Sequence, residues 1–161
     1  MNKTVIIGIG NPLRGDDGAG WAVVDAIWAE PIEGVTAVSS HQLLPELIDL
    51  FRQAMQVIFV DASVVGEPGD VAITAVLPEM DGPAATHHLH PGVLLALGLK
   101  IYGRMPPAYL ITISGDDFGY QETLSAKVAR GVGTAVCQIR QLVDRASFFS
   151  EPGVSLENAI N

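Results

Sequence analysis

The chain is poor in cysteine and has no long hydrophobic run. A single cysteine, Cys137, rules out an internal disulfide and fits a reducing compartment. No apolar stretch reaches the roughly 18 residues of a membrane span, and the N-terminus lacks the basic, apolar and cleavage regions of a signal peptide. We therefore expect a cytoplasmic protein that does not cross a membrane. Nucleophilic catalysis is poorly supported, because G-x-S-x-G is absent and Cys137 has no cysteine–histidine signature beside it; the zincin motif H-E-x-x-H is absent too.

Basic residues are also scarce. Nine lysines and arginines stand against 18 aspartates and glutamates, which gives a formal net charge of −9. Such a charge opposes binding to nucleic acid or to an anionic membrane surface, and it is compatible with a cationic ligand or a basic peptide. The 161 residues, 48% of them hydrophobic, are enough for one compact domain. We expect that domain over residues 1–147 and an irregular tail over 148–161.

Hydrophobic periodicity predicts an alternation of strands and helices. Short apolar runs indicate strands at 4–9, 35–38, 57–60, 71–76 and 108–114. Apolar residues at helical spacing indicate helices at 18–30, 43–51, 91–97 and 124–143. This order predicts an α/β fold with a mostly parallel sheet of about five strands, covered on both faces. The strand at 71–76 has a mixed character that suits the edge of the sheet.

The first strand runs into a glycine-rich turn, Gly8-Ile9-Gly10, that carries the adjacent carboxylates Asp16 and Asp17. One reading is a dinucleotide fingerprint, but Leu13 stands at the third glycine position and the carboxylates would repel a pyrophosphate. A second reading is a cation site with hard oxygen ligands. In a third interpretation, one aspartate is the N-cap residue of the helix and the other is exposed to solvent.

Further metal-competent side chains are expected at the same edge of the sheet. Asp61 follows a buried strand, and His87 to His90 precede a helix that starts at Pro91. Two carboxylates and an imidazole would suit a borderline divalent ion such as zinc or nickel. His90 also suits the N-cap of that helix, His88 suits solvent, and His41 is a reserve candidate at the start of the second helix.

Several segments together resemble the hydrogenase maturation endopeptidases, the family that trims the large subunit of nickel-iron hydrogenases. The first is Gly8-Ile9-Gly10-Asn11-Pro12-Leu13-Arg14-Gly15-Asp16-Asp17-Gly18-Ala19-Gly20, which is long enough to be specific. The resemblance continues through residues 41–47, 57–61, 86–91 and 113–119. It thus spans about residues 4–145.

The resemblance implies a three-layer α/β/α fold and one cleavage near the C-terminus of the large-subunit precursor, after nickel insertion. It implies that Asp17, Asp61 and His87 form the catalytic and nickel-recognising site; position 17 is often glutamate in related proteins. Nickel would be recognised in the substrate or bound directly, with no organic cofactor, and we expect a monomer. The alternative is a chaperone that binds the precursor without cutting it, and a dinucleotide-dependent oxidoreductase is a distant third.

Overall fold

The computed structural model describes residues 4–80 and 89–149. Strands and helices alternate along most of the chain, as the hydrophobic pattern predicts. The elements, in chain order, are β1 (Thr4–Ile9), η1 (Gly15–Gly18), α1 (Ala19–Ala29), β2 (Val35–Ser40), η2 (Pro45–Leu47), α2 (Ile48–Phe51), β3 (Gln56–Ser63), β4 (Val71–Val76), α3 (Pro91–Tyr102), β5 (Ala108–Ser114) and α4 (Ala126–Phe149), of which η1 and η2 are short 3-10 helices.

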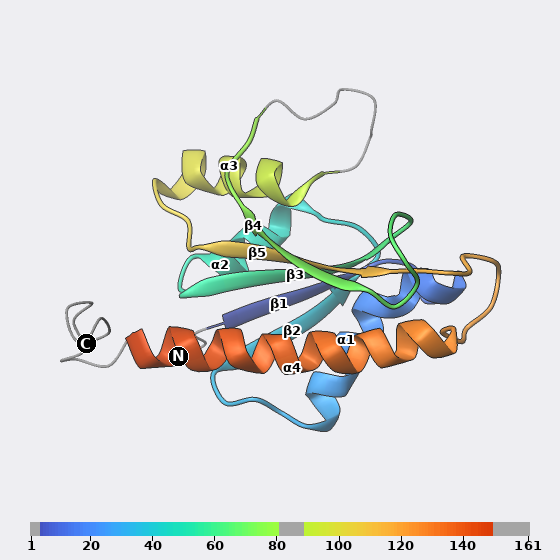
Figure 1. The fold of residues 1–161 in the computed structure, drawn as a ribbon. Coiled ribbons are helices and arrows are strands. Elements are labelled where there is room, and N and C mark those ends of the chain that lie inside the picture. Colours follow the sequence, from blue (N-terminus) through green and yellow to red (C-terminus); the bar gives the residue numbers. More distant parts are fainter. Residues whose placement is uncertain (1–3, 81–88, 150–161) are drawn as a thin grey trace.

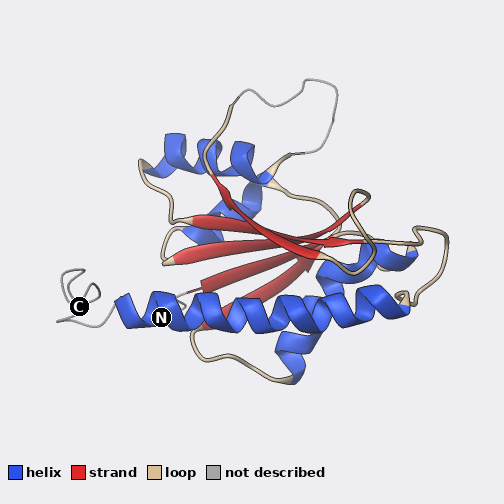
Figure 2. Cartoon of the chain, viewed as in Figure 1, coloured by secondary structure: helices blue, strands red, loops and turns tan. Residues whose placement is uncertain are grey.

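The five strands form one sheet in the order β2-β1-β3-β5-β4. β2, β1, β3 and β5 are parallel, and β4 pairs antiparallel with β5. Helices α2 and α3 cover one face of the sheet, and α1 and α4 cover the other (Figures 1 and 2). The α/β class, the three layers and the edge position of β4 are as predicted.

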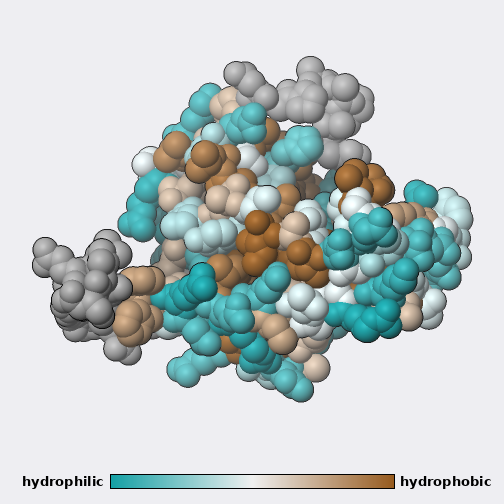
Figure 3. Space-filling view, viewed as in Figure 1, coloured by the Kyte–Doolittle hydropathy of each residue, from teal (hydrophilic) through white to brown (hydrophobic). Residues whose placement is uncertain are grey.

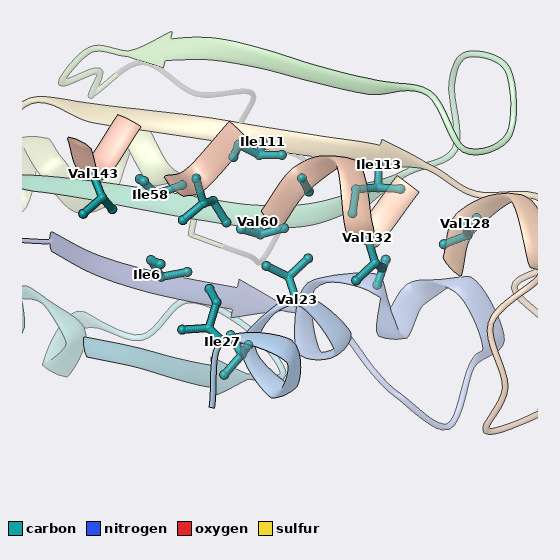
Figure 4. Close-up of a cluster of buried hydrophobic side chains, with 14 residues drawn as sticks. Ile6, Val23, Ile27, Ile58, Val60, Ile111, Ile113, Val128, Val132 and Val143 are labelled. Carbon is teal, nitrogen blue, oxygen red and sulfur yellow. The ribbon is translucent and has the colours of Figure 1, made fainter. Parts of the chain in front are cut away.

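Alternation along the buried strands separates two hydrophobic cores. On β3, Ile58 and Val60 pack with α1 and α4, while Val57 and Phe59 pack with α2 and α3. Figure 4 shows the first core, in which side chains of the sheet and of the two helices point toward one another. No helix in the described part of the chain has the length and hydrophobicity needed to cross a membrane.

Several boundaries differ from the sequence-based predictions. β3 runs to Ser63, so Asp61 lies within the strand rather than after it. The predicted second helix is shorter, because the segment that begins at Pro45 forms a 3-10 turn before α2. α3 continues past Gly98 to Tyr102 and ends where Gly103 adopts a left-handed conformation with φ of 73°. α4 extends to Phe149, beyond the boundary expected at residue 147.

Candidate functional site

The turn after β1 is built from closely packed backbone. Gly10 has a φ of +139°, and a Cβ at this position would collide with the carbonyl oxygen of Asp17. A residue with a side chain would therefore be strained and would also lack space. This close approach of backbone brings η1 against the end of β1 and fixes where the Asp17 main chain lies.

Asp16 is fully buried and ties three segments together. Its carboxylate accepts hydrogen bonds from the backbone N–H groups of Asp116 (2.8 Å), Asp117 (2.9 Å) and Ser125 (2.8 Å), and from the Ser125 hydroxyl (2.9 Å). Burial by itself raises the pKa of Asp16, but these hydrogen bonds outweigh it and the pKa lies below its usual value. Asp16 is thus an ionised structural group that holds the segment from β5 to α4 against η1.

The interpretation in which Asp16 or Asp17 caps the first helix, one of the three left open by the sequence, is wrong. The residues that precede η1 and α1 are Arg14 and Gly18, and neither makes a side-chain capping hydrogen bond. Both aspartates lie inside η1 instead. Because consecutive residues of a 3-10 helix point about 120° apart, one carboxylate can enter the interior while its neighbour faces outward.

A pocket of about 330 Å³ opens at the carboxyl ends of the parallel strands. Its walls come from the ends of β1 and β2, from β3 and from the start of α3. The lining residues are Ile9, Gly10, Asp17, His41, Gln42, Leu43, Asp61, Leu89, His90 and Pro91. Open α/β sheets bind their ligands at this edge, so the position of the pocket is the one expected for a ligand site in this topology.

Asp17 enters this pocket from η1, and Asp61 enters it from β3. Asp17 Oδ2 accepts a hydrogen bond of 2.8 Å from the backbone N–H of Asn11, which orients the carboxylate. Asp61 lies two residues after Phe59 on β3, so its side chain is on the α2/α3 face.

The environment of Asp61, which includes the Asp17 carboxylate, changes the pKa of Asp61. Burial chiefly, and the charge of Asp17 in addition, raise the pKa of Asp61 to about 6, although a hydrogen bond from the backbone of Ala62 opposes the shift. Asp61 can therefore gain or lose a proton close to neutral pH. This is the protonation behaviour that acid–base chemistry at neutral pH requires.

His41 forms another side of the pocket and lies against Trp21. The two ring centroids are 5.0 Å apart with an interplanar angle of 52°. The Trp21 Nε1–H donates a hydrogen bond of 3.1 Å to the carbonyl of Ser40, which fixes the indole at the end of β2. The sequence analysis named His41 as a reserve candidate and gave no role to Trp21, whose only signal was its position directly after the glycine-rich motif.

The predicted histidine cluster is described only in part. His90 lines the pocket and occupies the N-cap position of α3 without a side-chain capping hydrogen bond, and Pro91 begins the helix as expected. His87 and His88 lie outside the described residues. Among residues 4–80 and 89–149, no three His, Cys, Asp or Glu side chains form a group that could hold a metal ion. Of the predicted set Asp17, Asp61 and His87, the first two share the pocket, which the candidates His41 and His90 also line.

The fold is shared with solved structures of hydrogenase maturation proteases. The hydrogenase maturating endopeptidase HybD from E. coli is 20% identical, with a TM-score of 0.71 over 89% of this chain and 93% of that one. The protease HycI from Thermococcus kodakarensis is 24% identical, with a TM-score of 0.70 over 89% of this chain and 93% of that one.

A third similar structure is the hydrogenase 2 maturation peptidase from a Thaumarchaeota archaeon. It is 24% identical, with a TM-score of 0.65 over 88% of this chain and 97% of that one. No protein-family model and no curated protein matches the sequence. At this level of identity the comparisons establish a common fold, and the function has to be argued from the site.

Proposed function

We propose that this protein is an endopeptidase that removes the C-terminal extension of a nickel-iron hydrogenase large subunit after nickel insertion. The observation that carries the proposal is the pocket that holds Asp17 and Asp61 at the strand ends, in a fold shared with solved hydrogenase maturation proteases. The sequence motif that contains Asp17 supports the same conclusion.

In this proposal the substrate brings the nickel, bound by its own cysteines. Asp17, Asp61 and His87 contact the nickel-bearing region of the precursor and hold the scissile peptide next to the pocket. Carboxylate and imidazole are ligand types that a borderline divalent ion accepts, so the residue types fit this role. Recognition of the metal would restrict cleavage to precursors that already contain it, and correct positioning lowers the barrier to hydrolysis.

Hydrolysis also needs proton transfer. A water molecule attacks the scissile carbonyl carbon and gives up a proton, the carbon–nitrogen bond breaks, and the leaving nitrogen takes a proton. Asp61, with a pKa of about 6, is suited to accept the first proton as a carboxylate and to return it to the leaving nitrogen. The neighbouring charge of Asp17 favours the protonated form of Asp61 and so assists the accepting step.

The test is to mix the purified protein with the precursor large subunit of the same organism's hydrogenase, with and without inserted nickel, and to measure intact masses. We expect loss of a C-terminal peptide only from the nickel-loaded precursor. The variants Asp17→Asn, Asp61→Asn and His87→Ala should each abolish this loss. Asp116→Asn, which changes an exposed aspartate away from the pocket lining, is the matched control and should cleave normally.

Two outcomes would contradict the proposal. A stable complex on a sizing column, with no change in precursor mass, would indicate a chaperone that binds without cutting. Normal cleavage by all three site variants would mean that the chemistry lies elsewhere on the protein.

A further inference from the structure

The two edge strands of the sheet, β2 and β4, differ in whether other described residues cover their outward backbone groups. On β2, the carbonyls of Gly34 and Ser40 accept hydrogen bonds from β1, so the alternate residue Ala37 presents its carbonyl outward. The Trp28 Nε1–H donates a hydrogen bond of 3.1 Å to that carbonyl. An indole thus covers part of this edge, and a covered edge is protected from pairing with a further strand.

The opposite edge, on β4, has no such cover among the described residues. The carbonyl of Asp70 accepts a hydrogen bond from Ser114 on β5, so the backbone groups of Val71, Ile73 and Ala75 point away from the sheet. The strand reads VAITAV, with neither proline nor charge to discourage pairing. Hydrophobic side chains gather over β4 in Figure 3. The Ile73 side chain of β4 is 38% exposed.

The β4 edge is also linked to the pocket by the register of the sheet. Asp61 on β3 is paired with Thr112 on β5, and Thr112 is paired with Ala72 on β4. The three side chains share the α2/α3 face and form a row from the pocket to the edge. With strands about 4.8 Å apart, a strand added to β4 would lie about 15 Å from Asp61, a span of about five extended residues.

From these observations we infer that the free edge of β4 pairs with an extended segment of the precursor next to its scissile bond. The inference rests on the proposed function and names the surface that binds the substrate backbone. Outward N–H and C=O groups at every second residue are complemented by an extended polypeptide backbone, which gives affinity with little dependence on side chains. A second copy of this chain is a weaker occupant. It would pair through the six residues of β4, where a specific interface uses about 20–30 residues a side, whereas the precursor would also occupy the pocket.

The variant Ile73→Pro tests the pairing directly. Proline removes an N–H that points outward, so the hydrogen bonds from β4 to β5 are kept, and edge strands tolerate proline at such positions. Ile73→Ala is the matched control, because it loses the same side chain and keeps the N–H. The dissociation constant of the nickel-loaded precursor is measured for both variants. We expect binding by Ile73→Pro to be about tenfold weaker than by Ile73→Ala.

Equal dissociation constants for the two variants would overturn the inference. If Ile73→Pro fails to fold by circular dichroism, photo-cross-linking decides. A photoreactive residue at position 73 should capture the C-terminal part of the precursor, and one at position 37 on the covered edge should not. Capture at neither position, at both equally, or of a second copy of this chain from position 73 would overturn the inference.

The same experiments separate this inference from the proposed function. A wild-type protein that binds the precursor but leaves its mass unchanged contradicts the endopeptidase activity alone. Cleavage by the wild type together with equal binding by Ile73→Pro and Ile73→Ala contradicts the pairing of β4 alone.

Discussion

Replacing Asp61 by asparagine should stabilise the folded protein above neutral pH while it removes the proposed activity. The carboxyl has a pKa of about 6 in the folded chain against 3.8 for the free side chain. Its ionisation therefore opposes folding. The unfavourable contribution is absent well below pH 3.8, grows as the pH rises toward 6, and is constant above that.

The magnitude follows from the size of the shift. A difference of about 2.2 pKa units at 1.36 kcal/mol each gives about 3 kcal/mol as a ceiling. Asp61 is partly accessible to solvent, which screens the interaction, so we expect Asp61→Asn to gain about 1–3 kcal/mol at pH 8. Asparagine has nearly the same shape and keeps an oxygen that can accept the hydrogen bond from Ala62.

Urea unfolding of both proteins at pH 8 and pH 4 measures this effect. The stability difference between Asp61→Asn and wild type should shrink several-fold at pH 4, where Asp61 is protonated in the folded state. Asp116→Asn controls for the loss of one negative charge at an exposed position. A difference that is the same at both pH values, or a variant less stable than wild type at pH 8, would refute the reasoning.

Three further predictions concern the frame of the site. Asp16→Asn should lower the free energy of unfolding by about 2–3 kcal/mol at pH 7, measured with urea, because an amide nitrogen cannot accept the hydrogen bonds that the carboxylate receives. Since the pKa of Asp16 is lowered, this loss of stability should fade as the pH drops below 3.8. Equal stability of the variant and the wild type at pH 7 would contradict the prediction. Gly133→Ala should raise the free energy of unfolding by about 1 kcal/mol, because nothing lies within 4 Å of its added Cβ. Gly131→Ala should lower the free energy of unfolding, because the new Cβ would lie 2.8 Å from the carbonyl oxygen of Gly69. Thermal unfolding in which Gly131→Ala is more stable than Gly133→Ala would be inconsistent with this packing. His41→Ala should raise the KM for precursor processing severalfold. Trp21→Phe should raise it less, since phenylalanine keeps a ring beside His41 but loses the hydrogen bond to Ser40. Unchanged KM values for both variants would show that His41 does not contact the precursor.

The layers and strands could be predicted because the strands carry short, largely apolar runs between turn residues. The runs at 4–9, 71–76 and 108–114 coincide with β1, β4 and β5 residue for residue. The end of β3 was less predictable, since Asp61 breaks the apolar run while the backbone continues in the sheet to Ser63 through pairing with β5. Such pairing is a tertiary interaction, which periodicity within one segment does not contain.

The pocket was predictable in outline from the same topology. Parallel strands bring the segment after β1 and the end of β3 to one edge of the sheet, and the structure places Asp17 and Asp61 in the pocket there. The contribution of Trp21 was not predictable, because it depends on the distance between α1 and the end of β2. His87 remains a prediction, since it lies outside the described residues.

Asp16 and Asp17 show most clearly where sequence reasoning stops. They are adjacent, chemically identical and equally compatible with a cap, a ligand or a solvated charge. The short 3-10 helix separates them, because a step of about 120° sends one carboxylate to the backbone amides of residues 116, 117 and 125 and the other to the pocket. Their substitutions should therefore separate as well, with Asp16→Asn losing stability and Asp17→Asn losing processing of the precursor at nearly normal stability. If Asp17→Asn lost stability and Asp16→Asn lost only processing, the structural role assigned to Asp16 and the site role assigned to Asp17 would both be wrong.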